Sequence, residues 1–175
     1  MKAITLLTAK TCDPSVTPAS EKIRARLTPD SAVIQSRNPF FVPDDSRWTP
    51  KTLIGVKIDR LGMKIASKFA RRYYSEVITA IHPMPASDDE FEWMRDGALI
   101  VSDTAPADGV EDSLRAVLDD CVSLASRYLT LKTGDLILIP SPLDDEATES
   151  HLQPGMNHEI TGTPPGFPRF TLKVR

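Results

Sequence analysis

The stretch that decides the fold is residues 49–77, which read TPKTLIGVKIDRLGMKIASKFARRYYSEV. From Thr52 to Ile58, a β-branched residue occupies every second position. That period of two predicts a β-strand, and Leu53 makes its second face partly apolar as well. Gly62 then closes the strand with a turn.

A helix is expected next, over about residues 65–74. Ile65, Phe69 and Tyr73 recur at helical spacing and would form one apolar stripe. Residues 77–81 are again typical of a strand. This part of the chain therefore predicts the order strand, turn, helix, strand.

The other expected elements are short, and turn-forming residues separate them, in keeping with the 15 prolines of the chain. Strands are expected over 3–7, 31–35, 98–102, 135–139 and 170–174, an extended segment over 38–43, and polar or loop segments over 20–26, 83–92 and 104–109.

The clearest helix follows Asp112 or Ser113, either of which can cap its first turn. Its apolar face consists of Leu114, Val117, Leu118, Cys121, Leu124, Ala125 and Tyr128. Many short strands with two helices predict an α+β fold that is mostly β.

The bulk properties describe an ordinary globular protein. We expect one domain, 1–175, with 41% hydrophobic and 26% charged residues. A net charge of -3 argues against a nucleic-acid partner, and no apolar run is long enough to predict a membrane span. The apolar start is too short for a signal peptide, and Cys12 and Cys121 are too few for a disulfide framework. A cytoplasmic location is therefore expected.

Two blocks of sequence carry a family resemblance. The first includes residues 27–34, LTPDSAVI, and 38–44, NPFFVPD, and continues to His82; the second is residues 131–142, LKTGDLILIPSP. Together they resemble the small subclass of the fumarylacetoacetate hydrolase family over about half of the chain. The resemblance implies a mixed β-roll around a central cavity, usually in a homodimer. It also implies hydrolysis, decarboxylation or isomerisation of dicarbonyl acids such as acylpyruvates, with Mg²⁺ or a similar cation.

The sequence departs from the family pattern at the metal site. In the family a strand carries Glu-x-Glu, and a later strand carries an Asp. Counted back from Gly62, the two Glu positions correspond to Lys51 and Leu53. Counted forward from residues 73–76, YYSE, which resemble the family's Tyr-Tyr-x-Glu, the Asp position corresponds to His82. Positions 51 and 53 share one face of a strand, so that face presents an ammonium beside an isobutyl group. We therefore expect no metal and no other cofactor.

Other family features are altered as well. The middle of the family chain is shortened around 84–95, and the family's Thr-Gly-Thr-Pro is replaced by residues 139–142, in which only Ser141 keeps a hydroxyl. Residues 161–164 read TGTP but follow no such strand, so we interpret them as a coincidence.

Each candidate residue also has a plain structural interpretation. Lys51 is either a solvated lysine at a strand end or an ammonium that occupies the cation position. His82, which precedes a proline, is more typical of a turn than of a metal ligand. His151 and His158 lack a chelating spacing, Cys121 is expected in the core, and the acidic runs 88–90 and 144–146 lack the pattern of a calcium loop.

Three hypotheses about function follow. In the first, the protein has lost metal-dependent catalysis and is a binding or assembly module, a homodimer or a partner of an active relative, with a small carboxylate or keto acid as a possible ligand. In the second, an altered site of Lys51, His82 and Ser141 still converts dicarbonyl acids, for example through a Schiff base. In the third, the chain is a relic without a selected ligand.

Overall fold

The two longest strands form the centre of the fold. The computed structural model describes residues 1–7, 24–42, 47–85, 94–144 and 151–175. Strand β4 (Trp48–Ile58) and strand β5 (Tyr74–Pro85) pair antiparallel along their whole length. The alternation of residues 52–58 and the return strand at 77–81 are therefore confirmed, and both strands extend beyond the predicted limits.

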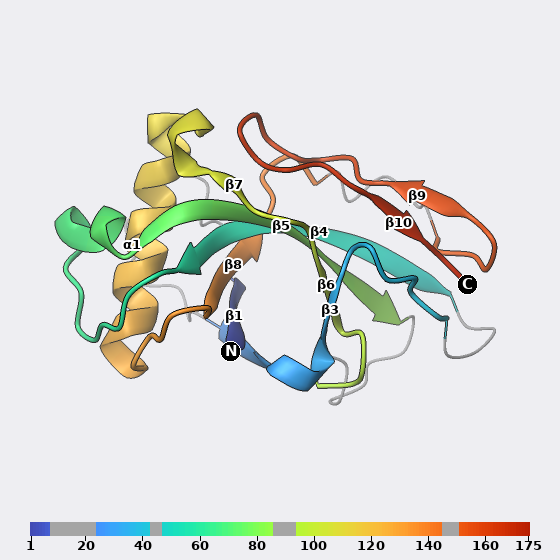
Figure 1. The fold of residues 1–175 in the computed structure, drawn as a ribbon, viewed down its shortest axis with the longest axis horizontal. Coiled ribbons are helices and arrows are strands. Elements are labelled where there is room, and N and C mark those ends of the chain that lie inside the picture. Colours follow the sequence, from blue (N-terminus) through green and yellow to red (C-terminus); the bar gives the residue numbers. More distant parts are fainter. Residues whose placement is uncertain (8–23, 43–46, 86–93, 145–150) are drawn as a thin grey trace.

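Around this pair, eight strands form one mixed sheet in the order β2-β1-β8-β4-β5-β6-β3, with β7 beside β5. The remaining strands are β1 (Lys2–Leu7), β2 (Arg24–Pro29), β3 (Val33–Gln35), β6 (Leu99–Val101), β7 (Ala105–Pro106) and β8 (Leu136–Pro140). The β1–β8 and β3–β6 pairs are parallel, and the others are antiparallel. Figure 1 shows the sheet curled into a roll, as expected for a mostly β α+β fold.

A short 3₁₀ helix, η1 (Asp30–Ala32), carries the chain from β2 at one edge of the sheet to β3 at the other edge. Two edges that are far apart in the sheet are therefore joined by only a few residues. This link holds the sheet in its curled shape (Figure 1).

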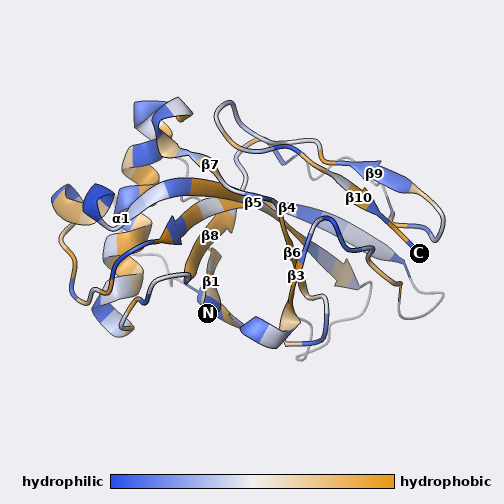
Figure 2. Cartoon of the chain, in the orientation of Figure 1, coloured by the Kyte–Doolittle hydropathy of each residue, from blue (hydrophilic) through white to orange (hydrophobic). Residues whose placement is uncertain are grey.

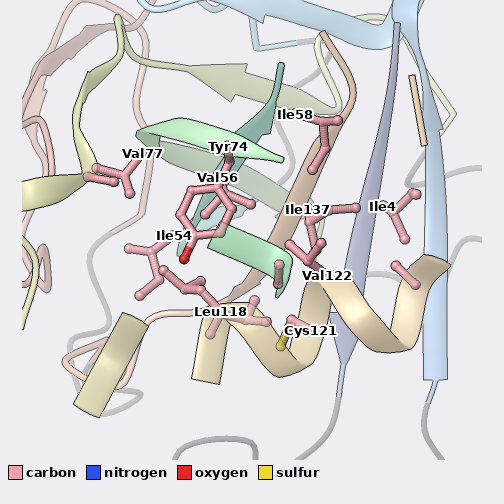
Figure 3. Packing of buried hydrophobic residues seen from close by; sticks show 14 of the residues in the cluster. Ile4, Ile54, Val56, Ile58, Tyr74, Val77, Leu118, Cys121, Val122 and Ile137 are labelled. Atoms are coloured by element: carbon pink, nitrogen blue, oxygen red, sulfur yellow. The ribbon is translucent and has the colours of Figure 1, made fainter. Parts of the chain in front are cut away.

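The convex face of the sheet is covered by α1 (Asp112–Tyr128), which packs its buried face onto β4, β5 and β8 (Figure 3). The predicted face is confirmed for Leu118, Cys121 and Ala125, which are buried, and Leu114, Val117 and Leu124 pack partly buried against the same cluster. Tyr128 was wrongly placed on this face, because it ends the helix beyond the sheet and is 78% exposed.

The predicted cap of α1 is also wrong. Glu111 occupies the N-cap position and makes no side-chain capping bond. The second predicted helix is present as the 3₁₀ helix η2 (Ser67–Arg72), shorter than 65–74. Within it Phe69 is 41% exposed, so the expected apolar stripe is only partly buried.

A second, two-stranded sheet consists of β9 (Asn157–Glu159) and β10 (Thr171–Lys173). Phe40 and Trp48 pack beneath it with Leu152 and Leu172. Figure 2 shows hydrophobic residues along the neighbouring strands β8, β4 and β5, at the centre of the large sheet. The third helical turn, η3 (Ala107–Gly109), precedes α1.

Most expected strands are present, and the differences have physical reasons. Strand β2 was missed because the first four residues of this edge strand, 24–27, are all exposed, so no alternation of apolar and polar positions marks it. The segment 31–35 begins as η1 and becomes a strand only at Val33. Pro83 and Pro85 belong to β5 rather than to a loop, and the rest of the loop expected over 83–92 lies largely outside the described residues.

Cys12 and the acidic run 88–90 lie outside the described residues. Cys121 is a buried free cysteine, as expected for a core residue. No helix of the described ranges combines the length and the apolar character that a membrane crossing requires.

Candidate functional site

Lys51, Leu53 and His82, the three positions matched by sequence to the family's carboxylates, are neighbours on two paired strands. Lys51 on β4 is directly opposite His82 on β5, and Leu53 is directly opposite Ala80. Alternation along each strand places Lys51, Leu53, Ala80 and His82 on one face. That face is the inside of the roll, because Leu53 and Ala80 pack there with residues from both halves of the sheet.

The inside of the roll is packed with apolar side chains. Leu53 is 2% exposed and belongs to a cluster with Ala3, Ile78, Ala80, Leu99, Val101, Leu136 and Leu138. Gly55, the next residue of β4 on this face, allows a close approach, since a Cβ atom there would lie 1.9 Å from the backbone oxygen of Ile137. Leu53 is therefore part of an apolar core.

His82 lies in the middle of a strand and is 1% exposed, so its interpretation as a turn residue is wrong. Its Nδ1 lies 2.7 Å from the carbonyl oxygen of Ala98. Because a carbonyl oxygen only accepts, Nδ1 carries the proton and donates it. This nitrogen has no lone pair to offer to a metal.

These residues do not fit a hard divalent cation. Such a cation requires several oxygen ligands, usually with carboxylates among them. Lys51 offers a positive charge, Leu53 offers no donor atom, and Nδ1 of His82 is already committed. Across the described ranges, no group of three or more His, Cys, Asp or Glu side chains is arranged to hold a metal ion.

Ser141 does not join Lys51 and His82. Its hydroxyl donates to the carbonyl oxygen of Gly162 and accepts from the backbone N–H of Leu143 at 3.3 Å. The neighbouring Thr52, which alternates with Lys51 and so points to the opposite face of β4, donates its hydroxyl to Thr161 at 3.1 Å. The structure therefore places Ser141 on the outer side of the sheet.

Residues 161–164, the TGTP segment, are the part of this region that sequence reasoning missed. The backbone carbonyl oxygens of Thr161 and Gly162 accept hydrogen bonds from the hydroxyls of Thr52 on β4 and of Ser141, which follows β8. Gly162 has a φ of +75°, and a Cβ atom there would lie 2.8 Å from the backbone oxygen of Leu143. The segment thus fills the space beside Ser141. In the sequence, its only distinguishing feature was that residues 161–164 have the same letters as the family's Thr-Gly-Thr-Pro motif.

A second polar cluster, also missed, lies on the convex face. Asp119 of α1 is 7% exposed and accepts from the hydroxyl of Tyr74 and from Nε of Arg71, each at 2.8 Å. Burial, together with the hydrogen bond to Asp119, raises the pKa of Tyr74 well above its usual value of 10.0. These contacts fasten α1 to β5 and η2, so the cluster is structural.

Comparisons with known proteins agree on the fold. No protein-family model and no curated protein matches the sequence. Fumarylpyruvate hydrolase from Pseudomonas aeruginosa, solved with Mn²⁺ and pyruvate, superposes with a TM-score of 0.68 at 14% identity, covering 99% of this chain and 88% of that one.

Two further solved structures are similar over 99% of this chain. One is a 5-carboxymethyl-2-hydroxymuconate delta-isomerase from Mycobacterium smegmatis, with a TM-score of 0.72, 17% identity and 78% of its length covered. The other is a yeast fumarylacetoacetate hydrolase family protein, with a TM-score of 0.67, 12% identity and 92% covered. This chain therefore has the fold of the fumarylacetoacetate hydrolase family.

Proposed function

We propose that this protein is a pseudoenzyme with the fumarylacetoacetate hydrolase fold, which acts in the cytoplasm as a metal-free binding or assembly module. One observation carries the proposal. At the position matched to the second family glutamate, Leu53 is buried in an apolar cluster. The next cross-strand pair on the same face is Lys51 with the hydrogen-bonded His82. A site of this composition repels a cation rather than binding it.

The ligand we propose for this site is a small carboxylate or keto acid. Lys51 is partly exposed and carries its positive charge on the inner face of the roll, where the family holds a metal. An ammonium attracts a carboxylate, but it does not polarise a keto oxygen as a divalent cation does. Binding without extra stabilisation of the transition state gives no acceleration.

Calorimetric titration with Mg²⁺ and with Mn²⁺ tests the loss of the metal site. The expected result is no binding tighter than about 100 µM, since no carboxylate remains at the three family positions. The matched control replaces Asp144, Asp145 and Glu146 with their amides, to remove binding by this acidic run. Tighter binding that survives this control would overturn the proposal.

Titration with pyruvate and with oxaloacetate tests the ligand. The expected result is weak binding that is lost in Lys51→Ala and kept in Lys57→Ala, a lysine on the same face of β4 that pairs with Glu76. No turnover of acylpyruvate or oxaloacetate above background is expected, with or without Mg²⁺. Binding that is equal in both variants would place the ligand elsewhere.

A second candidate function is favoured by the direct pairing of Lys51 with His82. In this alternative the lysine amine condenses with a keto group, releases water and leaves an imine. Reduction with cyanoborohydride in the presence of pyruvate would then add mass to the peptide that contains Lys51. A labelled peptide, with turnover that disappears in Lys51→Ala, would replace the pseudoenzyme by an altered hydrolase, isomerase or decarboxylase of dicarbonyl acids.

We also propose that the protein is a homodimer, because the curled sheet leaves β2 and β3 as edges that a second copy can protect. Light scattering from a dilute sample measures the mass directly. A value near the monomer mass of 19.3 kDa would contradict this proposal.

A further inference from the structure

A strongly basic surface segment lies outside the site described above. Residues 60–72, here called the basic segment, contain five Arg or Lys residues and no Asp or Glu, in a protein with a net charge of -3. All five are exposed: Arg60, Lys64, Lys68, Arg71 and Arg72. The charge of this segment is therefore opposite in sign to that of the whole protein.

The basic segment runs along one side of α1 and is fastened at several points. Gly62 exchanges two backbone hydrogen bonds, of 3.0 and 2.8 Å, with Leu131 beyond the end of the helix. Further along, the hydroxyl of Ser67 donates to Asp120 of α1 at 2.6 Å. A surface held in this way loses little conformational freedom when a partner binds.

Lys64 holds an unusual backbone conformation in this segment. Its φ of 54° is the only positive value at a non-glycine residue in the described part of the chain, and its backbone N–H donates to Ser126 at 2.8 Å. A left-handed conformation costs free energy for any residue with a Cβ atom, and glycine avoids that cost. The chain nevertheless carries an exposed lysine here, and strain of this kind gathers at functional positions.

Apolar side chains project between the charges. Leu61 and Met63, on either side of Gly62, are 69% and 52% exposed, and Phe69 is 41% exposed. Lys68 and Arg72 lie over the Phe69 ring, with Nζ and Cζ at 4.9 and 4.8 Å from its centre. Met, Phe and Arg are the residue types enriched in protein–protein interfaces.

We propose that the basic segment is a docking surface for an acidic, partly apolar segment of another protein. Arg71 already pairs with Asp119 of α1. We therefore assign the contacts with the partner's carboxylates to the ammonium and guanidinium groups of Lys64, Lys68 and Arg72. The exposed Leu61 and Met63 carry no charge and can contact the partner's apolar side chains. A single-stranded nucleic acid fits less well, because cations already lie over the one exposed aromatic ring of the segment. This inference is independent of the site on the inner face of the roll.

Fluorescence anisotropy with two labelled peptides tests the proposal. In one peptide Glu alternates with Leu, and in the other Lys replaces each Glu. The expected result is saturable binding of the acidic peptide alone, weakened by salt. Lys68→Glu with Arg72→Glu should weaken it about tenfold or more. The matched control Lys173→Glu, on an exposed position of β10, should change it less than about twofold.

Lys64→Gly separates docking from a structural role. It removes one charge and relieves the backbone strain, so affinity should fall several-fold while the melting temperature stays the same or rises. Equal binding of both peptides, or an equal loss in Lys173→Glu, would overturn the proposal. So would tighter binding to phosphatidylglycerol vesicles or to single-stranded RNA than to the acidic peptide, which would assign the surface to a membrane or a nucleic acid.

Discussion

The two faces of strand β4 carry different kinds of residue. On the convex face Ile54, Val56 and Ile58 pack against the core beneath α1, as regular alternation predicts. On the inner face Lys51, which is partly exposed, lies beside Leu53, which is buried in a separate apolar cluster. The same strand therefore has one face that is apolar from Ile54 to Ile58 and a second face on which a lysine lies beside a leucine.

This contrast teaches that fold and chemistry are separately encoded within one strand. The fold needs only apolar character at every second position, which many sequences supply. A metal site needs particular oxygen atoms at particular positions, and a single substitution removes each of them. Similarity of fold to the hydrolases and isomerases therefore carries little information about the inner face.

The largest effect is expected from the convex face. Leu118 is fully buried between α1 and the sheet. Leu118→Ala should lower the free energy of unfolding of the protein by about 2–5 kcal/mol. Tyr128→Ala on the same helix is the matched control, because Tyr128 is 78% exposed. A urea titration measures both free energies of unfolding, and a loss under about 0.5 kcal/mol for Leu118→Ala would mean that the helix face is not packed.

A comparable but smaller loss is expected on the inner face. Leu53→Ala should cost about 2–3 kcal/mol, because Leu53 packs in a smaller cluster than Leu118. The same urea titration measures this loss of unfolding free energy. If the variant is as stable as the wild type, the inside of the roll is open, and the two faces differ in packing as well as in chemistry.

The Asp119 cluster is expected to have an intermediate effect. Asp119→Ala leaves the buried hydroxyl of Tyr74 without its acceptor, which should cost about 1–3 kcal/mol. Arg127→Ala, on the same helix and exposed, should cost under about 0.5 kcal/mol. Equal losses in the two variants would show that helix propensity, rather than the buried hydrogen bond, sets the effect.

The smallest effect concerns pH. Burial lowers the pKa of His158 from its ordinary value of 6.5, so the unfolded chain takes up the proton at a higher pH than the folded chain does. Its contribution to stability is therefore complete above pH 6.5 and is lost as the pH falls below that value. His158→Asn should flatten the fall in melting temperature between about pH 7 and pH 5. An unchanged slope would contradict this assignment.

Much of the fold was predictable from local patterns, and part of the site was too. The period of two between Thr52 and Ile58 assigned both the strand and the shared face of Lys51 and Leu53. The position of Ser141 was not predictable, because its orientation depends on contacts with residues 161–164, about twenty residues further along. Tyr128 was misplaced because helical spacing does not reveal where the sheet beneath the helix ends.

The place of β8 in the sheet has a consequence for how the chain folds. This strand lies between β1 and β4, and it pairs Leu136 with Ala3 across most of the sequence. Until β8 has been synthesised, β1 lacks its parallel partner and β4 exposes one whole edge. Contacts between distant residues slow folding because a long loop must close first. The incomplete sheet on a ribosome therefore presents two open strand edges, and a chaperone that shields them should raise the yield of folded protein.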